Sequence, residues 1–303
     1  MKKIAIVASS DSGHVFDLAE AGLKQGFEVD QIPITSLESE LKGKEEIKGI
    51  VKTRFKANGK KSLKKKVKLA DYKLLLVRII PRGSLEQIVL RMDILRRLEG
   101  LGQRVINSAF AIEQTVNKYY TSSVLAAADL TVPKTFVAED AEQALDFFKQ
   151  EKDLIVKPLF GSLGKGMVRV KDEDSAYRIF KSWDYNNFVL YLQEFIEHKQ
   201  EDIRVFVLGD KVLGAIKRKG KDWKTNLARG AKAESIKVSP NLERIALKAS
   251  KTLNLDYAGV DIILNEKESG RPYLIEVNGI PGWKGFEEVT KINVAKELIA
   301  QFC

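Results

Sequence analysis

The chain has 303 residues, of which 44% are hydrophobic and 30% charged, and this composition is typical of a soluble globular protein. The length predicts two or three domains, because a single hydrophobic core rarely serves so many residues. No apolar run approaches the length of about 18 residues that a membrane-spanning helix needs, so no membrane partner is expected. The only cysteine, Cys303, excludes internal disulfides and cysteine-based zinc sites, and a cytoplasmic location follows as the expectation.

The net charge of +10 is concentrated in one segment. Residues 42–68 hold twelve Lys or Arg and two Glu, whereas the rest of the chain is balanced with 39 basic and 39 acidic residues. Within that segment, residues 50–57 and 60–69 flank Asn58-Gly59, which is a strong hairpin signal. The sequence therefore predicts a neutral body with one basic hairpin at about 50–69.

The first third of the chain alternates between apolar runs and amphipathic segments. The apolar runs predict strands at residues 4–8, 27–34, 72–79 and 102–107. Helical spacing predicts helices at 15–25 and 85–100, the latter with an apolar stripe of Ile88, Met92, Leu95 and Leu98. This alternation predicts a small α/β domain with a largely parallel sheet over residues 1–108.

A second region begins at residue 109 and has more strands. Helices are predicted at 111–128, 140–149, 175–183 and 242–253, with a last helix from about 293. Strands are predicted at 134–138, 154–158, 167–170, 189–195, 203–208, 211–217, 257–264 and 272–277. The fold class is therefore α/β (α+β), and we divide this region into domains at 109–192 and 193–303.

Two carboxylates and an amide near the end of the chain predict a metal site. If residues 257–264 and 272–277 pair as a hairpin, Asp261 and Glu276 lie near each other, and Asn278 lies on the same face as Glu276. Oxygen donors of this kind suit Mg²⁺ or Mn²⁺, which also bind phosphate oxygens. The alternative is a solvated hairpin with ordinary surface acids.

A glycine loop follows the predicted strand at 154–158. Its spacing, with Gly161, Ser162, Gly164 and Gly166, lets backbone N–H groups approach a phosphate closely. It fits neither a Walker loop nor a Rossmann fingerprint. Lys157 ends the strand just before the loop, where a lysine usually has an anionic partner. The alternative is a flexible hairpin loop.

Other polar groups gather at strand ends and turns. Gln193-Glu194-Phe195-Ile196 ends a strand whose backbone could pair with an adenine edge, and Glu194 could accept from ribose hydroxyls. Asp202 and Arg204 alternate onto one face of the next strand. Both histidines, His14 and His198, lack a metal or nucleophile partner and are expected to be structural or exposed.

Taken together, these motifs resemble the ATP-grasp fold and, within it, the RimK-like branch of carboxylate–amine ligases. The resemblance covers nearly the whole chain, with residues 1–108 corresponding to a pre-ATP-grasp domain. It is carried by Lys118, Val156-Lys157-Pro158, Gly161-Ser162-x-Gly164-x-Gly166, Gln193-Glu194-Phe195-Ile196, Asp202-Ile203-Arg204, Thr225-Asn226-x-x-Arg229-Gly230, Gly259-Val260-Asp261-Ile262, Glu276-Val277-Asn278 and Pro281-Gly282.

The resemblance implies a role for each of these positions. It implies ATP phosphate binding by the two lysines and the glycine loop, adenine and ribose contacts by residues 193–196, and metal binding by the hairpin acids. The implied ATP-binding residues are Lys118, Lys157, Gly161, Ser162, Gly164, Gly166, Gln193, Glu194, Phe195, Ile196, Asp202, Lys224, Thr225 and Asn226. The implied metal ligands for Mg²⁺ or Mn²⁺ are Asp261, Glu276 and Asn278, and the implied catalytic arginines are Arg204 and Arg229.

Enzymes of this branch make an acyl phosphate from a carboxylate and ATP, and an amine then displaces the phosphate. The resemblance therefore implies an ATP-dependent ligase, with L-glutamate as the added amino acid. Its acceptor would be acidic, either a protein C-terminal tail or a pterin- or deazaflavin-type coenzyme. The alternatives are a ligase that joins a different pair of amino acids and a nucleotide-binding protein without catalysis. Self-association of the chain is left open.

The acceptor is predicted to contact the first domain. Arg78, Arg82 and Ser84 follow a strand there, and we expect them to receive the acceptor carboxylate. The basic hairpin has three candidate uses: a solubilising surface, attraction of a polyglutamate acceptor, or contact with RNA that brings a ribosomal protein tail within reach. Phe55 is its only aromatic residue, which disfavours nucleic-acid recognition.

Overall fold

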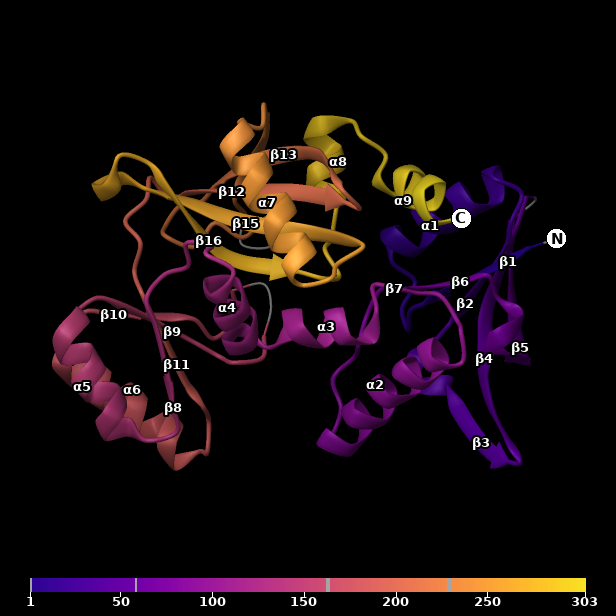
Figure 1. Cartoon of the computed structure of the whole chain (residues 1–303), viewed down its shortest axis with the longest axis horizontal. Coiled ribbons are helices and arrows are strands. Elements are labelled where there is room, and N and C mark those ends of the chain that lie inside the picture. The colour runs from indigo at the N-terminus through magenta and orange to yellow at the C-terminus, as the bar shows by residue number, and fades with distance from the viewer. Residues whose placement is uncertain (1, 58, 162–163, 228–229) are drawn as a thin grey trace. The chain divides into compact units, whose positions relative to one another are not determined.

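The computed structural model describes residues 2–57, 59–161, 164–227 and 230–303. Its chain divides into two compact units, which we describe separately. Unit 1 comprises residues 1–113, 255–257 and 279–303, and unit 2 comprises 114–254 and 258–278. Figure 1 labels the elements of both units.

Unit 1 is built on a sheet that combines parallel and antiparallel pairing. The strands are β1 (Lys3–Val7), β2 (Glu28–Ile32), β3 (Glu38–Lys42), β4 (Lys44–Lys56), β5 (Gly59–Lys68), β6 (Leu74–Val77) and β7 (Val105–Ile106). Their order is β3-β4-β2-β1-β6-β7, and β5 pairs with β4 beside this path. Parallel pairing joins β1 to β2 and β6, and β6 to β7, whereas β4 pairs antiparallel with its neighbours. The expectation of a largely parallel sheet thus holds only for the half that contains β1.

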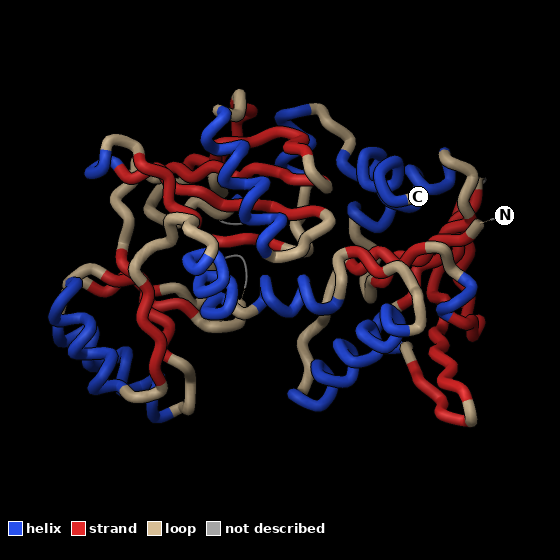
Figure 2. Tube along the Cα trace, in the orientation of Figure 1, coloured by secondary structure: helices blue, strands red, loops and turns tan. Residues whose placement is uncertain are grey.

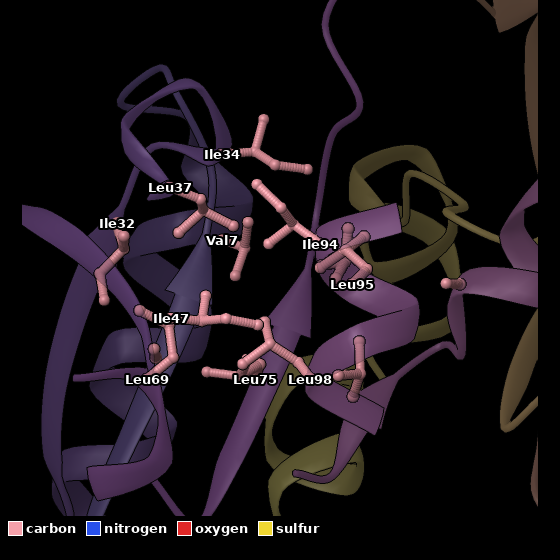
Figure 3. Close-up of a cluster of buried hydrophobic side chains, with 14 of the residues drawn as sticks. Val7, Ile32, Ile34, Leu37, Ile47, Leu69, Leu75, Ile94, Leu95 and Leu98 are labelled. Carbon is pink, nitrogen blue, oxygen red and sulfur yellow. The ribbon is translucent and has the colours of Figure 1, made fainter. Parts of the chain in front are cut away.

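Helices of unit 1 pack on this sheet, and two of them form the C-terminal end of the chain. They are α1 (Gly13–Lys24), α2 (Leu85–Gly100), α3 (Ala109–Val116, which crosses the unit boundary), α8 (Lys284–Thr290) and α9 (Val294–Phe302), with 3-10 turns η1 (Ile34–Ser36) and η2 (Leu69–Asp71). Figure 3 shows Ile94, Leu95 and Leu98 of α2 directed toward Val7 and Leu75 of the sheet. Burial of these side chains fixes α2 on the sheet.

The sequence patterns in unit 1 were right about α2 and incomplete elsewhere. The start of α2 has a capping box, because Ser84 Oγ accepts from the Gln87 N–H and Gln87 Oε1 accepts from the Ser84 N–H. Ile88 is 38% exposed, so the buried stripe of α2 begins one turn later than predicted. An unpredicted strand, β3, ends at Lys42, where the basic segment begins, and β4 starts at Lys44, earlier than predicted; the two strands turn at Gly43, which has φ of +74°.

Unit 2 contains two sheets. One has the order β10-β9-β11-β8 and comprises β8 (Thr135–Ala138), β9 (Leu154–Lys157), β10 (Val168–Val170) and β11 (Leu190–Glu194). The other has the order β14-β13-β12-β15-β16 and comprises β12 (Glu201–Leu208), β13 (Lys211–Lys219), β14 (Lys232–Ile236), β15 (Tyr257–Asn265) and β16 (Arg271–Asn278), with the 3-10 turn η4 (Glu266–Glu268) before β16.

Helices α4 (Lys118–Ala127), α5 (Ala141–Glu151), α6 (Glu173–Tyr185) and α7 (Pro240–Thr252) complete unit 2. Figure 2 shows α5 and α6 side by side along the first sheet, where Phe148 and Phe180 join its core. The single helix predicted at 111–128 is wrong, because Asn117 ends α3 and caps α4 by accepting from the Tyr120 N–H at 3.1 Å. Within the described residues, no helix is long and apolar enough to span a membrane.

Candidate active site

A pocket in unit 2 gathers most of the predicted ATP-binding residues. It lies where the two sheets of this unit contribute side chains from β9, β11, β12, β13, β15 and β16. The predicted residues that line it are Lys118, Lys157, Gly161, Gly164, Gln193, Glu194, Phe195, Ile196, Asp202, Lys224, Thr225, Asn226, Asp261 and Glu276. Gly166, Arg204 and Asn278 lie on adjoining elements, and Ser162 and Arg229 lie outside the described residues.

Two carboxylates stand opposite each other at one wall of this pocket. Asp261 on β15 pairs in register with Glu276 on β16, and Gly259 pairs with Asn278 two residues further along. Burial and the neighbouring charge of Asp261 raise the pKa of Glu276. The hairpin predicted from the sequence is thus present, with its two acids on the same face.

Two arginines hold Asp261 and its neighbour Asp202. Arg204 donates from Nε and Nη2 to the two oxygens of Asp261, each at 2.6 Å. Arg218 donates in the same bidentate way to Asp202 at 2.6 and 2.5 Å, and its Nη2 lies 3.1 Å from Asp261 Oδ2. Although burial raises the pKa of Asp261, the two guanidinium groups outweigh it and hold that pKa below its usual range. Thr225 Oγ1 also donates to Asp202, at 2.6 Å.

Two lysines enter the pocket without an ion-pair partner in the described part of the chain. Lys157 ends β9, is 6% exposed and donates to Gln193 Oε1, and burial lowers its pKa to about 8. Lys118 begins α4 and donates to the carbonyl of Gly161 at 2.9 Å, and burial also lowers its pKa. Both are therefore desolvated cations that a bound anion would stabilise.

The glycine loop packs against the turn that carries residues 224–226. Gly164 has φ of +67°, and a Cβ built on it would lie 2.4 Å from Asn226 Oδ1. Lys224 Nζ donates to the carbonyl of Met167 at 2.8 Å, which ties the two segments together again. Glycine at 164 is therefore required both by the backbone conformation and by the close approach of Asn226.

The strip at residues 193–196 is held by neighbouring segments of unit 2. Glu194 Oε1 accepts from the backbone N–H of Lys134 at 2.7 Å. The guanidinium of Arg169 lies 3.2 Å from the centroid of the Phe195 ring. His198 is buried, with ring nitrogens 2.7 Å from the carbonyl of Ile196 and 3.2 Å from that of Trp223. The expectation of a structural histidine is confirmed for His198.

The donor set on β15 and β16 fits a hard divalent cation. A carboxylate offers about four lone-pair positions. Three of those on Asp261 accept from Arg204 and Arg218, which leaves one for a metal ion. Asn278 Nδ2 is buried and has no hydrogen-bond partner within the described residues, and the oxygen of this amide is the atom that could bind a cation. Two carboxylates and an amide suit Mg²⁺ or Mn²⁺ and exclude soft, thiolate-binding metals.

The three residues predicted to bind the acceptor lie in unit 1 and differ in their availability. Arg78 donates to Tyr257 Oη at 2.7 Å and to the Pro281 carbonyl at 2.8 Å, and its guanidinium lies 4.2 Å from the Trp283 ring centroid. Ser84 caps α2. Arg82 is exposed, and no hydrogen bond, ion pair or ring contact of its side chain is found within the described residues.

The sequence analysis did not single out Arg218, which stands in the basic sequence Lys217-Arg218-Lys219, as a pocket residue. A signal was present: in a strand, Arg218 alternates onto the same face as the buried Ile216. Trp223 also lines the pocket and was not among the predicted site residues.

Comparisons with known proteins find a matching family model and several similar proteins. A family model described as the RimK-like ATP-grasp domain matches residues 115–302. The tetrahydromethanopterin:alpha-L-glutamate ligase of Methanosarcina acetivorans is 36% identical, and the match covers 76% of this chain and 80% of that protein. The alpha-aminoadipate–LysW ligase LysX of Sulfurisphaera tokodaii is 34% identical, over 66% of this chain and 72% of that one. A solved structure of the ATP-grasp ligase PsnB, complexed with a phosphomimetic variant of its minimal precursor, Mg and ADP, covers 100% of this chain and 98% of its own, with a TM-score of 0.72 and 20% identity.

Proposed function

The chain belongs to the RimK-like ATP-grasp family, and from this premise we propose that it joins L-glutamate to a pterin-type acceptor. Family membership makes it an ATP-grasp ligase with a mixed α/β fold, which confirms the resemblance, the fold class and the enzyme class predicted from the sequence. The choice of amino acid and acceptor rests on the relative from Methanosarcina acetivorans, whose name specifies both.

The observation that supports this function best is the pair of lysines in the unit 2 pocket. Lys118 and Lys157 are desolvated, and within the described residues their hydrogen bonds go only to a carbonyl oxygen and an amide oxygen. Burial lowers the pKa of both lysines, and the nearby charge of Glu276 partly offsets this effect. Phosphoryl transfer needs cations placed in advance around the phosphates rather than a covalent nucleophile. The pocket supplies such cations beside a glycine loop.

The proposed reaction has two steps. A carboxylate oxygen of the acceptor attacks the γ-phosphorus of ATP, ADP leaves, and an acyl phosphate forms. The glutamate amine then attacks the acyl carbon and loses a proton, and inorganic phosphate leaves with the electron pair of the broken C–O bond. A Mg²⁺ or Mn²⁺ ion held by Asp261, Glu276 and Asn278 would supply charge neutralisation at the phosphate oxygens.

Each pocket residue has a proposed part in binding the nucleotide. We assign the phosphates to Lys118, Lys157 and the glycine loop, and the adenine and ribose to residues 193–196. Asp202 supports this region indirectly, because both its oxygens accept from Arg218 and one also accepts from Thr225. Arg204, and with it Arg229, would balance the charge of the transferred phosphate.

Arg82 is the best candidate of the three proposed acceptor residues, because its side chain has no hydrogen bond, ion pair or ring contact within the described residues. Arg82→Ala should raise the acceptor KM about tenfold and leave the ATP KM unchanged, since one charged hydrogen bond contributes about 1.5–3 kcal/mol. Arg82→Lys, which keeps the charge, should lose less. An unchanged acceptor KM in Arg82→Ala would remove this residue from the acceptor site.

The function is tested by supplying purified protein with ATP, Mg²⁺, tetrahydromethanopterin and each amino acid in turn. We expect release of ADP and phosphate only with glutamate, together with a product heavier than the acceptor by one glutamyl residue. Glu276→Gln should abolish turnover. Turnover with glutamate but only with another class of acceptor would contradict the pterin assignment and leave the ligase class intact.

A ligase that joins a different pair of amino acids is the second candidate. It is favoured by the similarity to LysX, whose name specifies alpha-aminoadipate and LysW. The same amino-acid screen separates the two candidates, because alpha-aminoadipate would then support phosphate release in place of glutamate.

A further inference from the structure

The basic segment ends in a strand whose outer edge is free. Within the described residues β5 pairs only with β4, so its other edge presents unpaired backbone N–H and C=O groups (Figure 1). This strand of ten residues carries six lysines, and an open edge of this length is a template for a further strand. The edge lysines repel a basic strand and leave an acidic one as the favoured partner.

The positive charge of β5 is only partly balanced by the protein. Lys66 lies 2.7 Å from Glu38, Lys68 pairs with Glu46, and Lys60 lies 3.9 Å from Asp11. Lys61, Lys64 and Lys65 have no ion-pair partner within the described residues, and all three are exposed. Cations without an ion-pair partner therefore cluster on this strand, within the segment 42–68 that accounts for the whole net charge of +10.

A general need for solubility does not account for this arrangement. Solubility is served by charges of both signs dispersed over a surface, whereas six lysines fall within the ten residues of this one edge strand and repel one another. A partner with carboxylates would relieve that repulsion on binding.

We propose that the free edge of β5 is a docking site for an acidic peptide segment, which adds to the sheet as an extra strand. Backbone hydrogen bonds would supply affinity, and the lysines would select carboxylate side chains. A nucleic acid is the less suitable occupant, because Phe55, the only aromatic side chain of residues 42–68, is 6% exposed and offers no ring for base stacking. Only one part of this inference rests on the proposed function, namely that the docked peptide belongs to the acceptor or to a glutamate-rich product.

Binding of a blocked, fluorescently labelled decaglutamate peptide to the full chain tests the proposal. We expect anisotropy to report saturable binding that weakens as salt is raised from about 50 to 200 mM. The triple variant Lys61→Ser, Lys64→Ser, Lys65→Ser should weaken it about tenfold, consistent with three exposed ion pairs of modest strength. The matched control changes Lys232, Lys237 and Lys251 of unit 2 to Ser, removes the same charge and should change binding less than twofold.

Two further measurements separate strand addition from charge attraction alone. Amide hydrogen exchange of β5 should slow when the peptide binds. A peptide of alternating Glu-Glu and Pro-Pro pairs, which lacks half of the N–H donors on each of its two edges, should bind at least tenfold more weakly than a peptide of alternating Glu-Glu and Ser-Ser pairs. Equal loss in both triple variants, unchanged exchange in β5, equal binding of the two alternating peptides, or tighter binding of an RNA oligonucleotide than of decaglutamate would each overturn the proposal. Glutamate ligation to a pterin is measured without this peptide, so the two hypotheses fail separately.

Discussion

Removing Arg218 should destabilise unit 2 more than removing any other single charge in it. Arg218 is 3% exposed and bridges Asp202 and Asp261, which are 7% and 4% exposed. In Arg218→Met a side chain of similar length fills the space, but two carboxylates lose a buried cation. The energetic cost is then the burial of poorly compensated negative charge rather than a cavity.

The magnitude follows from the contacts that remain. Breaking a buried ion pair by removing one partner costs about 3–5 kcal/mol. Arg204 still binds Asp261 through two hydrogen bonds, and Thr225 still donates to Asp202, so the lower limit of about 3 kcal/mol applies. For a unit of this size each kcal/mol lowers Tm by about 2–4 °C, which predicts a fall of about 6–12 °C.

The loss should also depend on pH with a defined sign. In the wild type the pKa of Asp261 is below its usual range, so its contribution to stability is present near neutral pH and is lost as the pH falls through that lowered pKa. Without Arg218 the pKa values of both acids rise, and the penalty for burying them ionised disappears as they become protonated. The difference in stability between variant and wild type should therefore shrink between pH 7 and about pH 4.5.

Urea unfolding followed by circular dichroism at both pH values measures this difference. Arg218→Lys keeps the charge and should lie between the variant and the wild type. Arg169→Met is the matched control, because Arg169 also forms a bidentate pair, with Asp153, but at a partly exposed position, and it should lose about 1 kcal/mol or less. Equal losses in the two Met variants, or a loss at residue 218 that does not change with pH, would refute the reasoning.

Three further predictions concern the pocket and its support. The pKa of Lys157 is about 8, so kcat/KM for ATP should fall as the pH rises through 8 and the lysine loses its charge, whereas Lys157→Arg should show no such fall. Gly164→Ala should raise the ATP KM about tenfold, and Gly26→Ala, which also has positive φ but open space, should not. Asn107→Ala loses four hydrogen bonds to backbone groups of unit 1 and should lower the free energy of unfolding by about 3 kcal/mol, measured in urea.

Local sequence patterns predicted a helix correctly where the signals within its segment agreed, and failed where they conflicted or were absent. The helix at 85–100 was predicted from apolar spacing with the bounds that α2 has, and the capping box of Ser84 and Gln87 seen in the structure accounts for its start. The helix at 111–128 was predicted too long because apolar periodicity was given more weight than Asn117, whose side chain caps a new helix. β3 was missed since all its side chains are exposed, so no alternation marks it.

The family resemblance could likewise predict which side chains share one pocket, but not how far each is engaged by other groups of the protein. Lys118 and Lys157 were predicted as phosphate ligands, and the structure places both in one pocket. That Arg78 is tied to Tyr257 and Pro281 could not be predicted, because these partners are about 180 and 200 residues away in the sequence. Intramolecular contacts of this kind decide which of several arginines remains available to a substrate.

Two β-bulges explain why the centre of the pocket is the hardest part to read from sequence. Counted back from its turn, Leu208↔Lys211, the hairpin of β12 and β13 would pair Asp202 with Lys217, but a register shift after Phe206 brings Arg218 opposite instead. In β15 and β16 a shift after Asp261 similarly replaces Ile275 with Glu276 as its partner.

A shift of one residue moves a side chain to the other face of a sheet, so regular hairpins would have separated the acids from each other and from Arg218. The bulges therefore place Asp261 and Glu276 on one face and Arg218 against Asp202. Residue spacing shows which chemical groups are available, whereas an extra residue in each of two strands determines which of them meet. The sequence analysis predicted that Asp261 and Glu276 lie near each other, but a bulge depends on how two strands pair, so no pattern within a single strand could have predicted that Arg218 meets Asp202.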